Sequence, residues 1–248
     1  MKNVVLEDHG AIALLRLANG VTNAIGPSMV AELSAALREV KGRFRGLVLA
    51  GGNKFFSIGL ELPVLLKLSP PEMTAFWVKF EDTVLDLYTL PVPTAAAIAG
   101  HANGGGAILS LACDFRFIAA GRKLLSLNEV KIGLPVPYLA DLLLRQIAGD
   151  RIAVKLEFLS EFLAPEAAQA AGLADAVCPE EEVEALALSQ VQTVVDLPPF
   201  GFPMTKRHRV DPLRSQFLAE RQEITTAFMD LWAKPQVQHL LGEAAKKF

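Results

Sequence analysis

The fold is decided by the stretch Ile98-Ala99-Gly100-His101-Ala102-Asn103-Gly104-Gly105-Gly106-Ala107, where an apolar run passes through a glycine-rich turn into a helical pattern. A second such turn, Phe55-Phe56-Ser57-Ile58-Gly59-Leu60-Glu61-Leu62, follows another apolar run. Glycine permits positive φ and close approach of the backbone to a ligand, and the first N–H groups of a helix have no partner within it. Two such turns that face each other would bind an oxyanion.

Either glycine turn alone is explained well enough as a tight turn. No G-x-G-x-x-G dinucleotide pattern fits residues 100–106, because the next acidic residue, Asp114, comes too soon. A P-loop is excluded as well, since no Gly-Lys-Ser/Thr follows the turn. Ser57, Ser110 and Ser126 lack the G-x-S-x-G elbow that would expose a serine nucleophile.

Strand and helix patterns alternate outward from these turns. Short aliphatic runs predict strands, whereas apolar residues spaced three to four apart predict helices. The predicted strands are residues 11–17, 46–50, 94–99 and 115–119, and the predicted helices are residues 27–40, 71–90 and 107–113. This alternation indicates an α/β protein.

The pattern becomes mostly helical beyond Asp150. Helical spacing occurs at residues 151–162, 165–171, 180–195 and 213–232. Pro198, Pro199 and Pro203 interrupt it, because proline removes a backbone donor and restricts the preceding residue. We therefore predict a core over residues 1–197 and a C-terminal helical region over residues 198–248.

Composition narrows the function classes. The formal net charge is −3 and the chain has no basic stripe, which argues against a nucleic-acid partner. The short basic run at residues 206–209 is predicted to be a solvated patch that a phosphate-rich ligand could also use. Because 52% of the residues are hydrophobic and only 21% are charged, we expect neighbouring subunits to cover some apolar surface.

The cysteine usage and the N-terminus indicate the compartment. Cys113 and Cys178 lie far apart and outside any Cys-x-x-Cys spacing, so neither a disulfide framework nor a zinc site is expected. The first ten residues do not resemble a signal peptide, and no run approaches the ~20 apolar residues of a membrane span. We predict a cytoplasmic protein with no membrane partner.

Five segments, in this order, resemble the crotonase or enoyl-CoA hydratase/isomerase superfamily. They are Asn23-Ala24-Ile25, Phe56-Ser57-Ile58-Gly59-Leu60-Glu61-Leu62, the turn at residues 100–106, Cys113-Asp114-Phe115-Arg116 and Asn128-Glu129-Val130-Lys131-Ile132-Gly133-Leu134. The resemblance implies a crotonase-like spiral of ββα units with a C-terminal helical region. It also implies a homotrimer or a dimer of trimers.

The resemblance assigns an oxyanion hole to the two glycine turns. The backbone amides of Leu60 and Gly105 would hold the carbonyl oxygen of a coenzyme A thioester and stabilise its enolate. Aimed backbone donors of this kind cost no reorganisation during the reaction. The predicted substrate-binding residues are Ile58, Gly59, Leu60, Glu61, Leu62, Gly105 and Ile108, with no metal and no cofactor besides the coenzyme A of the substrate.

Glu129 is the predicted proton carrier. By composition alone a surface glutamate beside Lys131 would be the better explanation, because most glutamates are solvated. In its segment Glu129 occupies the position of the catalytic glutamate of the resembled family. The resemblance therefore favours a catalytic role for Glu129 over a surface position. Apolar neighbours would raise the pKa of its carboxyl if they bury it.

Ile108 points to one reaction within the family. Hydratases of the family carry a second glutamate two residues after the final glycine of the triplet, and this chain has Ile108 there. One carboxylate suffices to move a double bond, since it can take a proton from C2 and return it at C4. The Leu-Asn-Glu sequence at residues 127–129 also resembles that of monofunctional 3-enoyl-CoA to 2-enoyl-CoA isomerases. We therefore predict an enoyl-CoA isomerase.

Alternatives to this reaction stay open at the level of the sequence. One is an enoyl-CoA hydratase or acyl-CoA hydrolase that uses Glu61 as a second acid, although a structural role for Glu61 is preferred. Another is a non-catalytic acyl-CoA-binding homologue. Phe76, Trp77 and Phe80 recur at helical spacing and are predicted to be core residues, with the lining of an acyl pocket as the alternative. His101 is predicted to be a packed or hydrogen-bonded residue.

Overall fold

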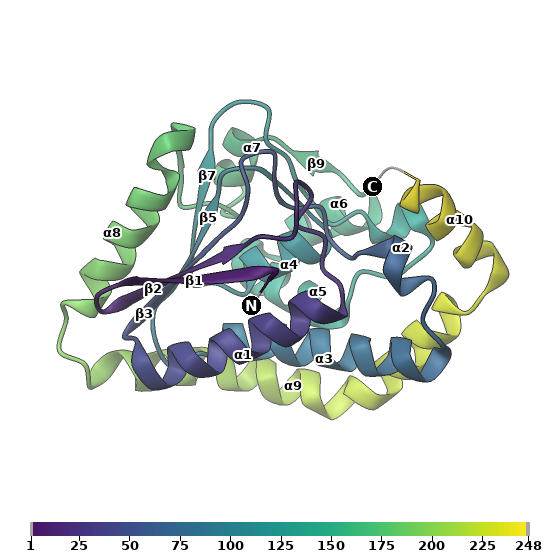
Figure 1. Cartoon of the computed structure of the whole chain (residues 1–248), viewed down its shortest axis with the longest axis horizontal. Coiled ribbons are helices and arrows are strands. Elements are labelled where there is room, and N and C mark those ends of the chain that lie inside the picture. The colour runs from purple at the N-terminus through teal and green to yellow at the C-terminus, as the bar shows by residue number, and fades with distance from the viewer. Residues whose placement is uncertain (1, 247–248) are drawn as a thin grey trace.

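The computed structural model describes residues 2–246 and contains a six-stranded sheet that runs through the molecule (Figure 1). Its order is β1-β2-β3-β5-β7-β10. The strands are β1 (Val4–His9), β2 (Ile12–Leu17), β3 (Gly46–Ala50), β5 (Thr94–Ile98), β7 (Phe115–Ala119) and β10 (Ala176–Cys178). Strands β1 and β2 are antiparallel, and all other neighbours are parallel. All four predicted strands are therefore present.

A second sheet is built from the segments that follow these strands. Its order is β4-β6-β8-β9, with β4 (Phe55–Ser57), β6 (His101–Asn103), β8 (Leu125–Ser126) and β9 (Phe162–Leu163). The chain passes from β3 to β4, from β5 to β6 and from β7 to β8, and a helix follows each of these pairs. This repeat confirms the predicted spiral of ββα units. The strands of the second sheet have only two or three residues, too few for an alternating pattern.

Helices cover both faces of the large sheet (Figure 1). Helix α8 (Val183–Val195) packs on one face against side chains such as Leu14, Val48 and Ala97. Leu15, Leu49 and Ile98 point to the opposite face, where they join a larger core with α1 (Pro27–Arg43), α3 (Pro70–Tyr88) and α4 (Gly105–Leu111). Burial on both faces explains why these strands read as continuous apolar runs.

The other α-helices also contribute buried side chains to this core. They are α2 (Leu62–Leu65), α5 (Tyr138–Ala148), α6 (Asp150–Phe158), α7 (Pro165–Ala170), α9 (Gly201–Trp232) and α10 (Pro235–Ala245), with two 3₁₀ turns, η1 (Glu129–Ile132) and η2 (Glu180–Glu182). Two predicted helices were too long. The helix predicted at residues 151–162 ends at Phe158, since Ser160 has a φ of 49° and Phe162 enters β9. The helix predicted from residue 180 starts at Val183, after η2.

The C-terminal helix α9 corrects the interpretation of Pro203. We predicted a break at this residue and a helix from residue 213, but α9 begins at Gly201 and continues past Pro212. Pro203 fits because it stands in the first helical turn, where the backbone N–H has no partner within the helix. Pro198 and Pro199 do lie between α8 and α9. The boundary at residues 197 and 198 stays a prediction.

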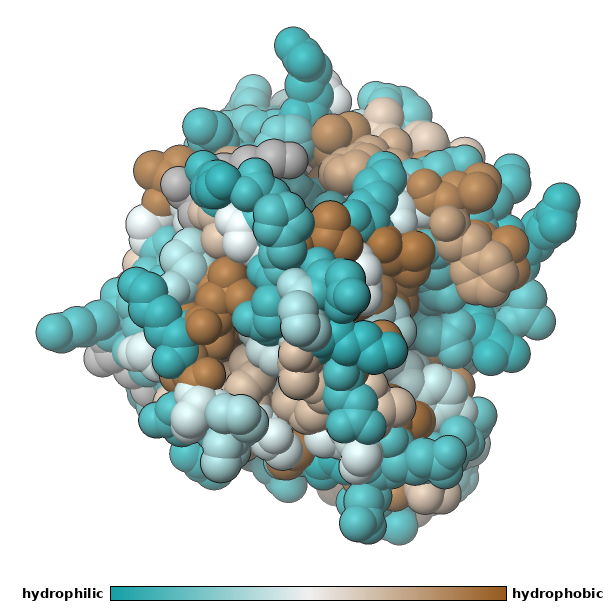
Figure 2. Space-filling view, turned by 90° about the vertical axis from the view of Figure 1, so that its right-hand side faces the viewer, coloured by the Kyte–Doolittle hydropathy of each residue, from teal (hydrophilic) through white to brown (hydrophobic). Residues whose placement is uncertain are grey.

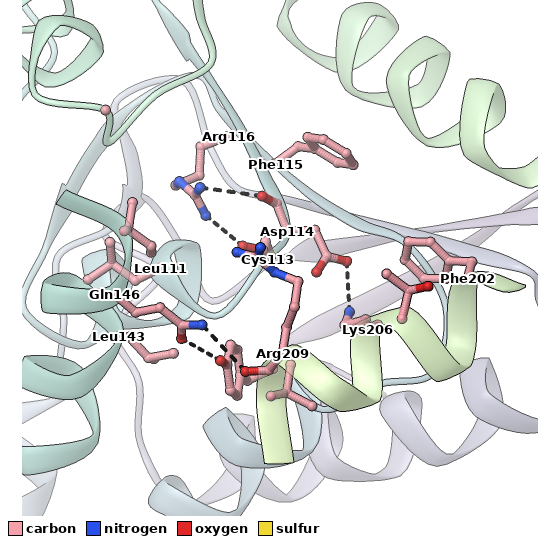
Figure 3. Close-up of a pocket in the computed structure, with 15 residues that line it drawn as sticks. Leu111, Cys113, Asp114, Phe115, Arg116, Leu143, Gln146, Phe202, Lys206 and Arg209 are labelled. Atoms are coloured by element: carbon pink, nitrogen blue, oxygen red, sulfur yellow. Dashed lines mark hydrogen bonds and ion pairs between the residues drawn. The ribbon is translucent and has the colours of Figure 1, made fainter. Parts of the chain in front are cut away.

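Lys206 attaches α9 to the core. Its Nζ atom lies 2.7 Å from Asp114 Oδ2 (Figure 3) and 3.1 Å from the Val92 carbonyl oxygen. The side chain of Lys206 is only 4% exposed, so the prediction of a solvated patch was wrong for this residue. Asp114 also accepts hydrogen bonds from the backbone and hydroxyl of Thr94, so it links α9 to the start of β5.

Replacement of Lys206 by alanine is expected to lower the free energy of unfolding by about 3 kcal/mol, because loss of one partner leaves a partly buried charge uncompensated. Arg207→Ala is the matched control, since the Arg207 side chain is 76% exposed and its one ion pair within residues 2–246 is with Asp211, one turn away. Urea denaturation of both variants measures the difference. Equal midpoints would show that the pair does not hold α9.

The surface combines hydrophilic and apolar side chains. Figure 2 views the end that carries α2 and α10, where apolar side chains are exposed between hydrophilic ones. Elsewhere Phe158 is 70% and Phe200 87% exposed. In residues 2–246, no helix combines the length and apolar character that a membrane span requires.

Candidate active site

A cavity of about 310 Å³ lies where the two glycine turns meet. It brings together every predicted site residue except Glu61. The lining residues are Ile58, Gly59, Leu60, Leu62, Trp77, Phe80, Asn103, Gly104, Gly105, Ile108, Asn128, Glu129, Ile132, Leu134, Pro137, Phe162, Phe228 and Ala244.

The first turn is held by the segment that contains Ile25. The Ile25 N–H donates to the Gly59 carbonyl at 2.8 Å, and the Glu61 N–H donates to the Ile25 carbonyl at 3.0 Å. Gly59 itself has a φ of +104°, a conformation that side chains rarely allow. These bonds bracket Leu60, whose own N–H makes no hydrogen bond within the described part of the chain. The Leu60 amide is therefore free to bind a ligand.

The second turn presents a comparable amide at the start of a helix. Gly104 has a φ of +49°, and its N–H donates to the Ser126 carbonyl at 2.9 Å. Gly105 is the first residue of α4, so its N–H has no helical partner, and none of the other residues between 2 and 246 accepts from it. This N–H is the second free donor.

The two turns are in direct backbone contact. A Cβ atom placed on Gly59 would lie only 2.9 Å from the Asn103 carbonyl oxygen and 3.2 Å from the Gly105 nitrogen. Any residue other than glycine would push the turns apart. The contact places the free amides of Leu60 and Gly105 beside the same cavity, as an oxyanion hole requires.

Glu129 points toward this pair of amides. Its Oε1 atom lies 3.3 Å from the position that a Cβ atom of Gly104 would occupy. The Oε2 atom is shielded from solvent and has no hydrogen-bond partner within residues 2–246. Burial raises the pKa of the Glu129 carboxyl to about 7, and the backbone N–H of the same residue opposes this shift. A carboxyl with such a pKa can both take and return a proton near neutral pH.

A short 3₁₀ turn fixes the position of Glu129. The Glu129 carbonyl accepts a hydrogen bond from the Leu134 N–H at 3.1 Å, and Gly133 closes the turn with a φ of +79°. On the outer side, Lys131 Nζ donates to the Ser160 carbonyl at 2.8 Å. Lys131 therefore holds the turn and does not pair with the carboxylate of Glu129.

The opposite wall of the cavity is apolar. Ile108 on α4 is 2% exposed, and no second carboxylate joins Glu129 among the described residues that line the cavity. His101 lies outside the cavity and accepts a hydrogen bond from the Leu124 N–H at its Nδ1, so its predicted packing role is confirmed. Among residues 2–246, no three His, Cys, Asp or Glu side chains are grouped as a metal site requires.

Glu61 is not among the residues that line the cavity. Its carboxylate lies against the backbone of Gly26, where an added Cβ atom would meet Glu61 Oε2 at 2.1 Å. Burial raises the pKa of this carboxyl. Its backbone carbonyl accepts from the N–H groups of Val64 and Leu65 in α2. These contacts favour the structural role of Glu61 over a role as second acid.

Several lining residues were missed or misplaced by sequence reasoning. Trp77 and Phe80 line the cavity, although the helical spacing of α3 predicted core positions, and both are also buried. Phe228 and Ala244 come from α9 and α10, far along the chain. No local pattern marks them, because only the packing of α9 on α3 and of α10 on α2 brings them to the cavity.

The fold and the cavity define an α/β spiral protein that offers two free backbone amides and one buried carboxyl to a ligand. The chain belongs to the enoyl-CoA hydratase/isomerase family, whose model matches residues 7–247.

Relatives and solved structures agree with this membership. The human protein named enoyl-CoA delta isomerase 1, mitochondrial, is 28% identical over 243 residues, which cover 96% of this chain and 80% of that protein. The crystal structure of human mitochondrial delta3-delta2-enoyl-CoA isomerase superposes with a TM-score of 0.94 at 26% identity, covering 99% of this chain and 97% of the other. An enoyl-CoA hydratase from Mycobacterium ulcerans Agy99 has a TM-score of 0.80 at 27% identity, with coverages of 92% and 96%.

Proposed function

We propose that this protein is an enoyl-CoA isomerase that moves a double bond from C3 to C2 of an acyl-CoA thioester. One observation carries the proposal: Glu129 is the only carboxylate among the described lining residues of a cavity that also holds two unpaired backbone amides. Such a site can shuttle one proton but has no second carboxylate to activate water.

The oxyanion hole acts on the thioester carbonyl. In this mechanism the oxygen accepts hydrogen bonds from the Leu60 and Gly105 amides, which strengthen as the oxygen gains negative charge. Neither amide must break a bond to a protein acceptor first. The enolate is therefore stabilised by donors that are already in place.

Glu129 transfers the proton in two steps. Its carboxylate takes a proton from C2, the C2–H electron pair forms the C1–C2 double bond of the enolate, and the carbonyl π electrons move to the oxygen. The enolate oxygen then re-forms the carbonyl, the C1–C2 π pair becomes the C2–C3 double bond, and the C3–C4 π pair takes the proton from Glu129 to form the new C4–H bond. Ile108 and the other apolar side chains of the wall keep the intermediate away from water.

The proposal is tested by incubation with 3-enoyl-CoA substrates of several chain lengths. Formation of the conjugated 2-enoyl-CoA is followed by its absorbance. We expect turnover with at least one chain length, and absence of turnover at all of them would overturn the proposal.

The pH dependence follows from the raised pKa of Glu129. Its ionised form is the base, so kcat/KM is expected to fall about tenfold per pH unit below a pKa of about 7 and to level off above it. A pH profile of kcat/KM measures this. A midpoint near 4.5, the ordinary value, would mean that the carboxyl is not buried in the free enzyme.

Hydration is the second candidate, because a solved hydratase shares the fold at 27% identity. It would need a further acid or base that the described lining residues do not supply. Product from labelled water separates the two reactions, since only hydration incorporates oxygen. A homotrimer or a dimer of trimers remains our expectation for the assembly.

A further inference from the structure

A second cavity of about 560 Å³ adjoins the first. The two share Trp77, Pro137 and Phe228 as a common wall. We call the second one the acidic cavity. Its lining residues are Trp77, Glu81, Val130, Pro135, Val136, Pro137, Tyr138, Asp141, Glu157, Phe158, Ile224, Ala227, Phe228 and Leu231.

Three carboxylates and no cation line this cavity among the described residues: Glu81, Asp141 and Glu157. Two of them have cations nearby. Arg145 lies 3.5 Å from Asp141, and Arg221 lies 3.8 Å from Glu81. Glu157 forms no ion pair with any residue between 2 and 246. Burial, together with the nearby Asp141 carboxylate, raises the pKa of Glu157 to about 7, so a cation beside it would stabilise its charged form.

Two of the three carboxylates, Glu81 and Glu157, are buried and have oxygens without a hydrogen-bond partner among residues 2–246. Glu81 is 2% and Glu157 7% exposed. Both carboxylate oxygens of Glu81 and Oε1 of Glu157 are shielded from solvent and accept no hydrogen bond from residues 2–246. A buried acceptor without a donor is destabilising, and more so when it is charged. A ligand with N–H donors and positive charge would remove that destabilisation.

The rest of the lining suits an apolar chain. The rings of Trp77 and Phe228 stack with centroids 3.7 Å apart. Ile224 and Leu231 add aliphatic surface from α9, and Phe158 stands exposed at 70%. Aromatic faces also attract cations, which adds to the pull of the carboxylates.

We propose that the acidic cavity binds an alkylammonium group, that is, an apolar chain that ends in a protonated amine and meets Glu157. Two sources share this chemistry. The group can be the far end of the acyl chain of the substrate, which the shared wall of Trp77, Pro137 and Phe228 places next to the thioester site. It can also be a separate amine. The first source rests on the proposed function, and the second does not.

Binding is measured with hexylammonium and with hexanol, a neutral molecule of similar size. Trp77 lines the cavity, so tryptophan fluorescence reports occupancy without any turnover. We expect saturable binding of hexylammonium that is at least about tenfold tighter than that of hexanol. Equal binding of the two probes, or no binding of hexylammonium, would overturn the proposal.

Variants locate the site at Glu157. Glu157→Gln removes the charge and keeps the shape, and it should weaken hexylammonium binding about tenfold. Glu161→Gln is the matched control, because Glu161 is exposed and does not line the cavity. Unchanged affinity in Glu157→Gln would contradict the assignment. Because Trp77 also lines the first cavity, Glu129→Gln is the second variant: hexylammonium affinity should be unchanged in it, and a loss of affinity would place the amine in the first cavity and overturn the proposal.

The two sources are separated by kinetics. A 3-enoyl-CoA with an amine at its far end should have a higher kcat/KM than its methyl-ended counterpart if the acyl chain supplies the group. Equal values together with tight hexylammonium binding identify a separate amine as the ligand. Turnover of the methyl-ended compound tests the proposed function by itself, so the failure of one proposal is distinguished from the failure of the other.

Discussion

Replacement of Glu129 by glutamine is expected to lower kcat for isomerisation about 10²- to 10⁴-fold, the range of a lost general base. Glutamine keeps the size of the side chain but cannot take a proton from C2. The effect should be large because no other described lining residue carries a carboxylate that could substitute. Substrate affinity should change little, since the oxyanion amides belong to Leu60 and Gly105.

Controls for Glu129→Gln separate chemistry from folding. Glu161→Gln removes the same charge at an exposed position and should keep full activity. Burial of the Glu129 carboxylate without a partner is unfavourable, so the glutamine variant should be at least as stable to urea as the unaltered protein. Full activity in Glu129→Gln would remove Glu129 from the mechanism.

Replacement of Gly59 by alanine is expected to lower kcat about 10²- to 10³-fold, the loss that follows removal of one oxyanion donor. Alanine tolerates a φ of +104° poorly, and its Cβ atom would come within 2.9 Å of the Asn103 carbonyl oxygen. Relief of this contact must turn the Leu60 amide or separate the two turns. Either change misplaces a hydrogen bond to the enolate oxygen.

Gly20→Ala is the matched control for Gly59→Ala. Gly20 also has a positive φ, +63°, but an added Cβ atom would meet nothing within 4 Å. It therefore carries the backbone strain without the contact between the turns. We expect its kcat to stay within about twofold of the unaltered protein, because it lies away from the oxyanion amides. Equal losses in both variants would mean that strain, and not the position of the Leu60 amide, determines the effect.

The sequence was informative where local chemistry sets the structure. Glycines at the ends of apolar runs predicted both turns, and the structure shows why, since Gly59 and Gly104 have positive φ and the turns touch. Four of the six strands of the large sheet were predicted because they are largely buried on both faces, whereas the more exposed β1 and β10 were missed. The identity of Glu129 as a candidate needed the resemblance, because nothing in its immediate composition separates it from a surface glutamate.

Contacts between distant segments were not predictable in the same way. Phe228 reaches the cavity because α9 packs along α3, and this depends on a helix whose start we placed twelve residues too late, at residue 213 in place of Gly201. Lys206 was assigned to the surface because it opens a basic run with Arg207, His208 and Arg209, and those three are indeed exposed. Only the fold reveals that Lys206 faces Asp114.

Product analysis of a single turnover tests the central claim most directly. Enzyme in excess is mixed with 3-enoyl-CoA in ¹⁸O-labelled water, and the acyl product is analysed by mass spectrometry. The single-carboxylate mechanism predicts 2-enoyl-CoA with the same elemental composition as the substrate and no labelled oxygen. A labelled 3-hydroxyacyl-CoA or a labelled free acid as the main product, or unchanged substrate, would contradict it.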